Sequence, residues 1–147
     1  MVGLHMACSL LSYAAFLVAF VAGGCFLLQE RQVKRRTLGW WFHRLPSLMV
    51  LDRLNAGAIT AGFVLLTAGL ACGLAGLRAL RGSWWVQDPK VYTALGLWAA
   101  YFVLWRLRRR QTLRGRRVAI LSILGFGLLV FTLLQASYLS HSSHPYL

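Results

Sequence analysis

The stretch LHMACSLLSYAAFLVAFVAGGCFLL, residues 4–28, contains no Lys, Arg, Asp or Glu. A run of about 20 apolar residues is long enough to cross the hydrocarbon core of a membrane. Outward from this stretch, three more apolar runs with few or no charges follow at 56–77, 88–105 and 118–139. The sequence therefore predicts an all-α, polytopic membrane protein with four transmembrane helices, formed as a single transmembrane domain over residues 1–147.

The 16 Lys and Arg residues are unevenly distributed, and all but Arg78, Arg81 and Lys90 lie in the gaps 29–55 and 106–117. Because basic residues collect on the cytoplasmic side, both gaps are predicted inside and both termini outside a bacterial inner membrane. A net charge of +13 also suggests nucleic acid as a partner. The cations flank the spans and form no separate basic domain, so we predict no nucleic-acid binding.

The first of these gaps contains a pattern of its own. Pro46 and Ser47 are typical of a helix start. In the segment 48–55 that follows, leucines recur every three residues and polar residues lie between them. This pattern predicts a short amphipathic segment lying on the cytoplasmic membrane surface.

Four glycines of the second span recur at helical spacing, so they share one face of that helix. Small residues at this spacing let a neighbouring helix approach closely. We predict that the face packs against another helix. Its members are Gly62, Gly69, Gly73 and Gly76.

The four histidines are sorted by the predicted topology. His5 opens the first span, and His141 and His144 follow the fourth, so all three are predicted on the outer face. His43 lies in the cytoplasmic gap. Imidazole is the usual ligand of haem iron, and two imidazoles can ligate it axially.

The loop between the second and third spans adds aromatic residues to the same outer face. Trp84 and Trp85 offer flat rings that suit a porphyrin plane, and Asp88 caps the third helix. Arg78 or Arg81 can pair with haem propionates. Together with the histidines, these residues predict a haem site at the outer membrane face.

Other kinds of site are poorly supported. The outer face has one acid, and no carboxylate pair, Ser/His/Asp set or glycine-rich phosphate loop is present. Cys8, Cys25 and Cys72 lack metal-ligand spacing and are predicted to be buried thiols, although a disulfide between Cys8 and Cys72 stays open. We predict binding and delivery of a ligand rather than catalysis.

Residues 82–90, GSWWVQDPK, resemble the tryptophan-rich motif of the cytochrome c assembly family, haem-handling membrane proteins of the CcsA, CcmC and HemX type. Residues 4–14 are similar to the histidine-opened span of this family, and LRGRRVA at 113–119 is similar to its last basic loop. The tail HPY at 144–146 resembles its closing His-Ser-Tyr. The resemblance covers nearly the whole chain, but only the C-terminal part of longer members.

This resemblance implies a set of haem contacts at the outer face. His5 and His144 would be the axial ligands, with His141 as a second candidate for the tail ligand. The loop residues Trp84, Trp85 and Asp88 would contact the haem. The implied function is haem handling in cytochrome c assembly or a related haem pathway. The implied partners are membrane lipid, a partner membrane subunit or second copy, and a c-type apocytochrome.

The motif is incomplete, which keeps two alternatives open. Arg106 stands where the family has a further histidine, so the chain resembles the small HemX-like branch most. One alternative is therefore a structural or regulatory membrane subunit that binds no haem. The other is a b-type cytochrome anchor, although such anchors usually place paired histidines inside facing helices.

Overall fold

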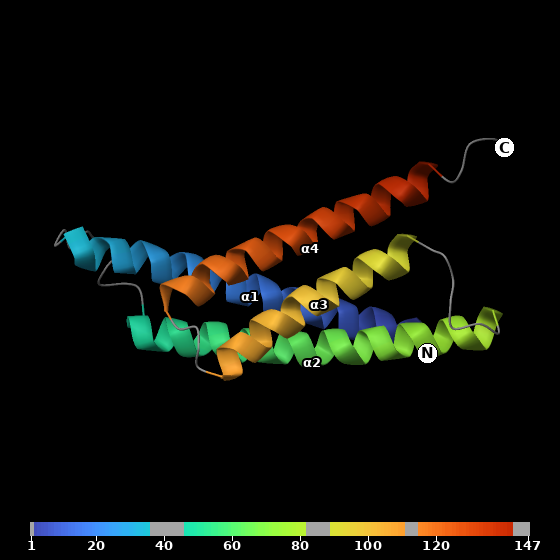
Figure 1. The fold of residues 1–147 in the computed structure, drawn as a ribbon, viewed down its shortest axis with the longest axis horizontal. Helices are drawn as coiled ribbons and strands as arrows, with labels where there is room; N and C mark the ends of the chain where they lie inside the picture. The colour runs from blue at the N-terminus through green and yellow to red at the C-terminus, as the bar shows by residue number, and fades with distance from the viewer. Residues whose placement is uncertain (1, 36–45, 82–88, 111–114, 143–147) are drawn as a thin grey trace.

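The computed structural model describes residues 2–35, 46–81, 89–110 and 115–142. These residues form four α-helices: α1 (Val2–Arg35), α2 (Leu48–Arg81), α3 (Pro89–Arg109) and α4 (Arg116–Ser142). No strand occurs within the described ranges, so the predicted all-α class is confirmed. The helices lie side by side in an elongated bundle, and successive helices run in opposite directions (Figure 1).

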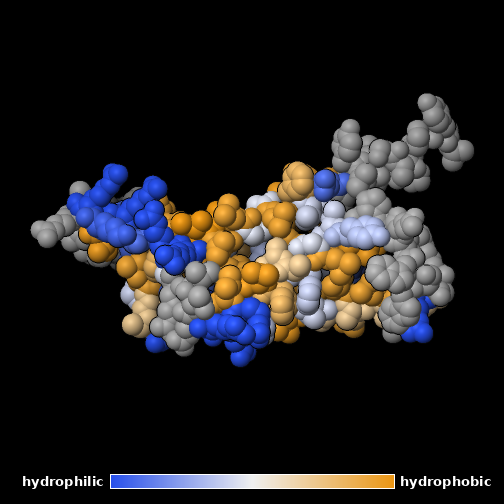
Figure 2. All heavy atoms as spheres, in the orientation of Figure 1, coloured by the Kyte–Doolittle hydropathy of each residue, from blue (hydrophilic) through white to orange (hydrophobic). Residues whose placement is uncertain are grey.

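The bundle has two chemically different ends. The starts of α1 and α3 lie at the same end as the ends of α2 and α4, and we call this the His5 end (Figure 1). We call the opposite end the arginine end, because α1 finishes there at Arg35, α3 at Arg109, and α4 begins at Arg116. Hydrophilic residues gather at the arginine end, while the middle of the molecule is mainly hydrophobic (Figure 2).

Three of the four helices, α1, α2 and α4, are long and apolar enough to cross a membrane. Only 28%, 28% and 22% of their apolar windows are buried inside the bundle. Leu10, Val64 and Leu124, for example, are 66%, 58% and 63% exposed. A soluble monomer rarely exposes so much contiguous apolar surface, whereas lipid covers it without cost. The chain is therefore an integral membrane protein.

Residues 48–55, predicted as a short amphipathic segment on the cytoplasmic membrane surface, form the first part of the long helix α2. The helix begins after Ser47, whose carbonyl oxygen accepts the N–H of Leu51 at 3.0 Å. It continues unbroken because Leu51 and Asn55, one turn apart, both face the other helices and are only 3% exposed.

Asn55 joins three helices near the arginine end. Its Nδ2 donates to the carbonyl oxygen of Ala19 at 2.7 Å and to Oγ of Ser122 at 3.0 Å. Ser122 in turn donates to the carbonyl oxygen of Ala119 at 2.9 Å. These hydrogen bonds link α1, α2 and α4 in a region where each missing bond would be costly. We call this set the Asn55 junction.

The glycine face of α2 packs against α1, and these two helices share the most extensive interface in the bundle. A Cβ atom built at Gly62 would lie 2.5 Å from the ring of Phe16, so a larger residue does not fit there. Gly69 and Gly73 also contact α1, whereas Gly76 has no described neighbour within 4 Å. The predicted packing role is thus confirmed for three of the four glycines.

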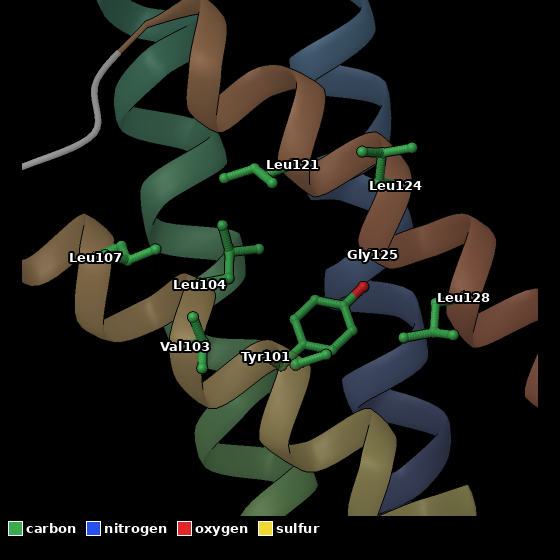
Figure 3. A pocket seen from close by; sticks show the side chains of 9 residues that line it. Tyr101, Val103, Leu104, Leu107, Leu121, Leu124, Gly125 and Leu128 are labelled. Carbon is green, nitrogen blue, oxygen red and sulfur yellow. The ribbon is translucent and has the colours of Figure 1, made fainter.

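Aromatic stacking connects α3 to the rest of the core. The ring of Tyr101 stacks on Phe16 with centroids 3.6 Å apart and planes 18° apart. Tyr101 lies beside a hollow of about 230 Å³ between α3 and α4, lined otherwise by Gly125 and aliphatic side chains (Figure 3). Its hydroxyl has no hydrogen-bond partner among the described residues.

At the arginine end, an ion pair joins α3 to the start of α2. Nη1 of Arg108 lies 2.9 Å from Oδ1 of Asp52, and Nη2 lies 2.7 Å from Oδ2 and 2.9 Å from the backbone oxygen. The Arg108 side chain is only 12% exposed. Two parallel charge-assisted hydrogen bonds fix both side chains in one orientation.

Candidate functional site

His5 lies in the first turn of α1, half-buried against α2. Its Nδ1 atom is 2.6 Å from the carbonyl oxygen of Gly69. A carbonyl oxygen only accepts hydrogen bonds, so we assign the imidazole proton to Nδ1, which then donates. The lone pair of Nε2 is thereby left available for a ligand, as in histidines that bind metals.

Two glycines of α2 make room for the start of α1: Gly73 for the imidazole of His5, and Gly69 for Ser9. A Cβ atom at Gly73 would lie 2.9 Å from Nδ1 of His5 and 3.0 Å from its Cε1. One turn earlier, a Cβ atom at Gly69 would lie 3.2 Å from Oγ of Ser9. The glycine face therefore does more than bring two helices together, because it also seats His5 against the α2 backbone.

His5 opens into a cavity of about 270 Å³ to which all four helices contribute. This volume lies just below the range of about 300–1,000 Å³ that is typical of small-molecule sites. The lining combines aliphatic side chains with a few polar ones. The polar members are His5, Ser9 and Tyr13 from α1, Thr93 from α3, and Thr132 from α4.

Sequence analysis identified His5 but not the other polar residues of this cavity. Ser9 and Tyr13 follow His5 at intervals of four, so a helical-face argument would have found them. Nothing in the sequence indicates Thr93 or Thr132, because only the packing of α3 and α4 brings them to α1.

The remaining predicted site residues lie outside the described residues: Trp84, Trp85, Asp88 and His144. The helices that flank them are described. α2 ends and α3 begins at the His5 end, and α4 ends there as well (Figure 1). His141 belongs to the last turn of α4.

The donor set of the described residues suits haem better than a bare metal ion. Nowhere in the described ranges do three His, Cys, Asp or Glu side chains come together to hold a metal. A haem iron already has four porphyrin nitrogens, so one or two imidazoles complete its coordination. The three cysteines are free thiols, so the open question of a Cys8–Cys72 disulfide is answered against it.

Residues 1–144 match the sequence profile of the family described as Cytochrome C assembly protein. The chain belongs to the cytochrome c assembly protein family. It is 29% identical to the cytochrome c biogenesis protein CcsA of Prochlorococcus marinus (strain NATL1A), over 97% of this chain and 53% of that protein. It is 35% identical to the CcsA of Synechococcus sp. (strain WH7803), over 65% of this chain and 30% of that protein.

The relatives within the cytochrome c assembly family are longer than this chain. The chain spans about half the length of the curated relatives that it matches along 97% of its own residues. No solved structure matches it.

Proposed function

We propose that this chain binds haem at the His5 end and takes part in cytochrome c assembly. The observation that carries the proposal is the 2.6 Å hydrogen bond between Nδ1 of His5 and the carbonyl oxygen of Gly69. It fixes one ring nitrogen as a donor and leaves the other as a ligand atom beside a cavity formed by four helices. The absence of a side chain at Gly73 supports the same assignment, because a Cβ atom there would lie 2.9 Å from Nδ1 of His5.

The other haem contacts follow from the resemblance to the family. We propose His144 as the second axial ligand, with His141 as the alternative from the same tail. Trp84, Trp85 and Asp88 would lie against the porphyrin. The chain positions of these residues support this assignment, because each follows or precedes a helix end that lies at the His5 end.

We further propose that α3 is the fourth membrane span. Its 21 residues extend about 31 Å at 1.5 Å per residue, which matches a hydrocarbon core of about 30 Å. The arginine end would face the cytoplasm of a bacterial inner membrane, because basic residues collect on that side. The His5 end, with both termini, would then lie outside. Cysteine labelling at Ser83 tests this orientation, and labelling from the cytoplasmic side would contradict it.

The relatives suggest partners for this activity. CcsA proteins are named for cytochrome c biogenesis, and this chain spans about half of one. We propose that it works with a partner membrane subunit or a second copy, and that a c-type apocytochrome receives the haem. Delivery, rather than catalysis by the chain alone, would be its contribution.

Absorbance spectroscopy of the purified protein tests the haem proposal. Wild-type protein with haem should give a six-coordinate spectrum, and His5→Ala should convert it to a five-coordinate or ligand-exchangeable one. His43→Ala is the matched control, because His43 is predicted at the opposite membrane face. Added imidazole should partly restore the His5→Ala spectrum by occupying the vacated axial position.

Three results would contradict the proposal. A wild-type spectrum in the variant that lacks both His5 and His144 would show that other residues ligate the iron. A chain that shows no Soret band when expressed with haem would instead fit a structural or regulatory subunit. Reversible redox cycling with rapid quinone oxidation would favour a b-type cytochrome anchor.

A further inference from the structure

Two hollows on the outward face of α2 run into each other. The first has a volume of about 530 Å³ and lies at the arginine end, between α2 and α3. The second has a volume of about 650 Å³ and continues along α2 toward the middle of the bundle. Both are lined by Ala56 and Thr60, so they form one continuous surface, which we call the α2 groove.

The arginine-end part of the α2 groove carries an excess of positive charge. Its lining includes Arg53, Arg108 and Arg109 but a single acid, Asp52. Both carboxylate oxygens of Asp52 already accept hydrogen bonds from Arg108. The two ion pairs found among the described residues involve neither Arg53 nor Arg109. Two exposed guanidinium groups therefore remain available to an anion.

Arg109 is held in place without losing its donors. Its guanidinium lies 5.2 Å from the centroid of the Trp105 ring, one turn earlier on α3. A contact of this kind engages the face of the guanidinium, whereas its N–H groups lie in the plane. A phosphate can thus accept hydrogen bonds from Arg109 while the tryptophan keeps the side chain oriented.

The second part of the α2 groove is apolar and shallow. Gly57, Ala61 and Val64 line it, and 58% of the surface of Val64 is exposed. The one polar residue, Thr60, donates its hydroxyl to the carbonyl oxygen of Ala56 at 2.9 Å, so its polar atom is satisfied. Such a surface suits a flexible hydrocarbon chain.

We propose that an anionic phospholipid occupies the α2 groove, with its phosphate on Arg53 and Arg109 and one acyl chain along Gly57 and Ala61. Basic pockets between transmembrane helices bind anionic lipid head groups in this way. The groove matches a phospholipid in its layout, because its cationic part lies at the end of the helices and its apolar part lies toward their middle. This inference does not depend on haem binding at the His5 end.

Lipid binding to the purified full chain tests the head-group contact. Phosphatidylglycerol should bind more tightly than phosphatidylcholine with the same acyl chains, as measured by native mass spectrometry. The double variant Arg53→Gln, Arg109→Gln should weaken phosphatidylglycerol binding by about tenfold or more, the loss expected for charge-assisted hydrogen bonds. The matched control is Arg31→Gln, Arg35→Gln, which removes equal charge from exposed positions on α1 at the same end. Equal losses in both variants would overturn the proposal in favour of general surface electrostatics.

A second pair of variants tests the acyl-chain contact. Ala61→Leu fills the groove and should weaken binding of both lipids. Ala68→Leu makes the same change two turns further along α2, at an exposed position outside the groove, and should have no such effect. If Ala61→Leu instead dissociates a dimer, the occupant is a second copy and the proposal is wrong. It is also wrong if haem displaces the lipid and the arginine variants alter the haem spectrum.

Discussion

The two ends of the bundle are built in opposite ways. At the arginine end, the Asn55 junction links three helices and the Asp52–Arg108 pair attaches the fourth, so side-chain hydrogen bonds fix all four helices. At the His5 end, one imidazole rests on a backbone carbonyl and borders a cavity lined by all four helices. One end of the bundle therefore fixes the helices to one another through side-chain hydrogen bonds, while the other leaves a cavity between them.

The largest stability effect should come from Arg108→Ala. Removing this guanidinium leaves Asp52, only 28% exposed, without its bidentate partner. The expected cost is about 2 kcal/mol, below the range for a fully buried pair because Asp52 retains some solvent. Thermal unfolding in detergent measures it. Adding Asp52→Asn to the variant should recover part of the loss, and no recovery would show that the charge of Asp52 is not the cause.

Asn55→Ala, at the same end, should reduce stability somewhat less. The variant removes two hydrogen bonds and leaves the Ser122 hydroxyl without its donor. We expect a loss of about 1–2 kcal/mol in the free energy of unfolding. Haem binding at the His5 end should not change. A change in the haem spectrum would contradict the separation between the two ends.

Gly73→Ala should lower haem affinity and leave stability nearly unchanged, the reverse of Asn55→Ala. The new Cβ atom would lie 2.9 Å from Nδ1 of His5, so the imidazole must shift away from the Gly69 carbonyl. Loss of an outer-shell partner typically lowers metal affinity by at least about tenfold. We expect that drop in haem affinity, with little change in unfolding temperature. Gly76→Ala is the control, because no described atom lies within 4 Å of its new Cβ.

Ser9→Ala should have the smallest effect. Its hydroxyl lines the cavity near Gly69, and the hydrogen bond that Ser9 accepts from Ser12 uses its backbone oxygen, which the variant keeps. The expected change in the free energy of unfolding is within about 0.5 kcal/mol. The haem affinity of Ser9→Ala should be measured beside that of Gly73→Ala. The comparison separates residues that position His5 from residues that only border the cavity.

Sequence patterns were most informative where an interaction is local. Apolar runs located the helices, and glycine spacing correctly indicated a face that contacts α1. The same reasoning failed at Asn55, because its partners Ala19 and Ser122 are on other helices and a polar residue among leucines resembles a surface segment. Asp52 and Arg108 are 56 positions apart in the sequence, so no spacing rule could pair them.

The candidate site was predictable in part for the same reason. His5 was found from its residue type and its place at the start of a span. The hydrogen bond from its ring to Gly69 joins residues 64 positions apart and required the structure. The assignments of Trp84, Trp85, Asp88 and His144 stay predictions, since these residues lie outside the described ranges.

The acceptor of the Nδ1 proton of His5, the Gly69 carbonyl oxygen, affects how strongly Nε2 would bind iron. A hydrogen bond that draws the Nδ1 proton away increases electron donation from Nε2, and the increase is greater when the acceptor carries a negative charge. Gly69 offers a neutral backbone carbonyl instead of a carboxylate. An iron–imidazole bond of the proposed site would therefore be weaker than one supported by a carboxylate acceptor. A weaker bond releases its ligand more readily, which agrees with the proposed role in haem delivery.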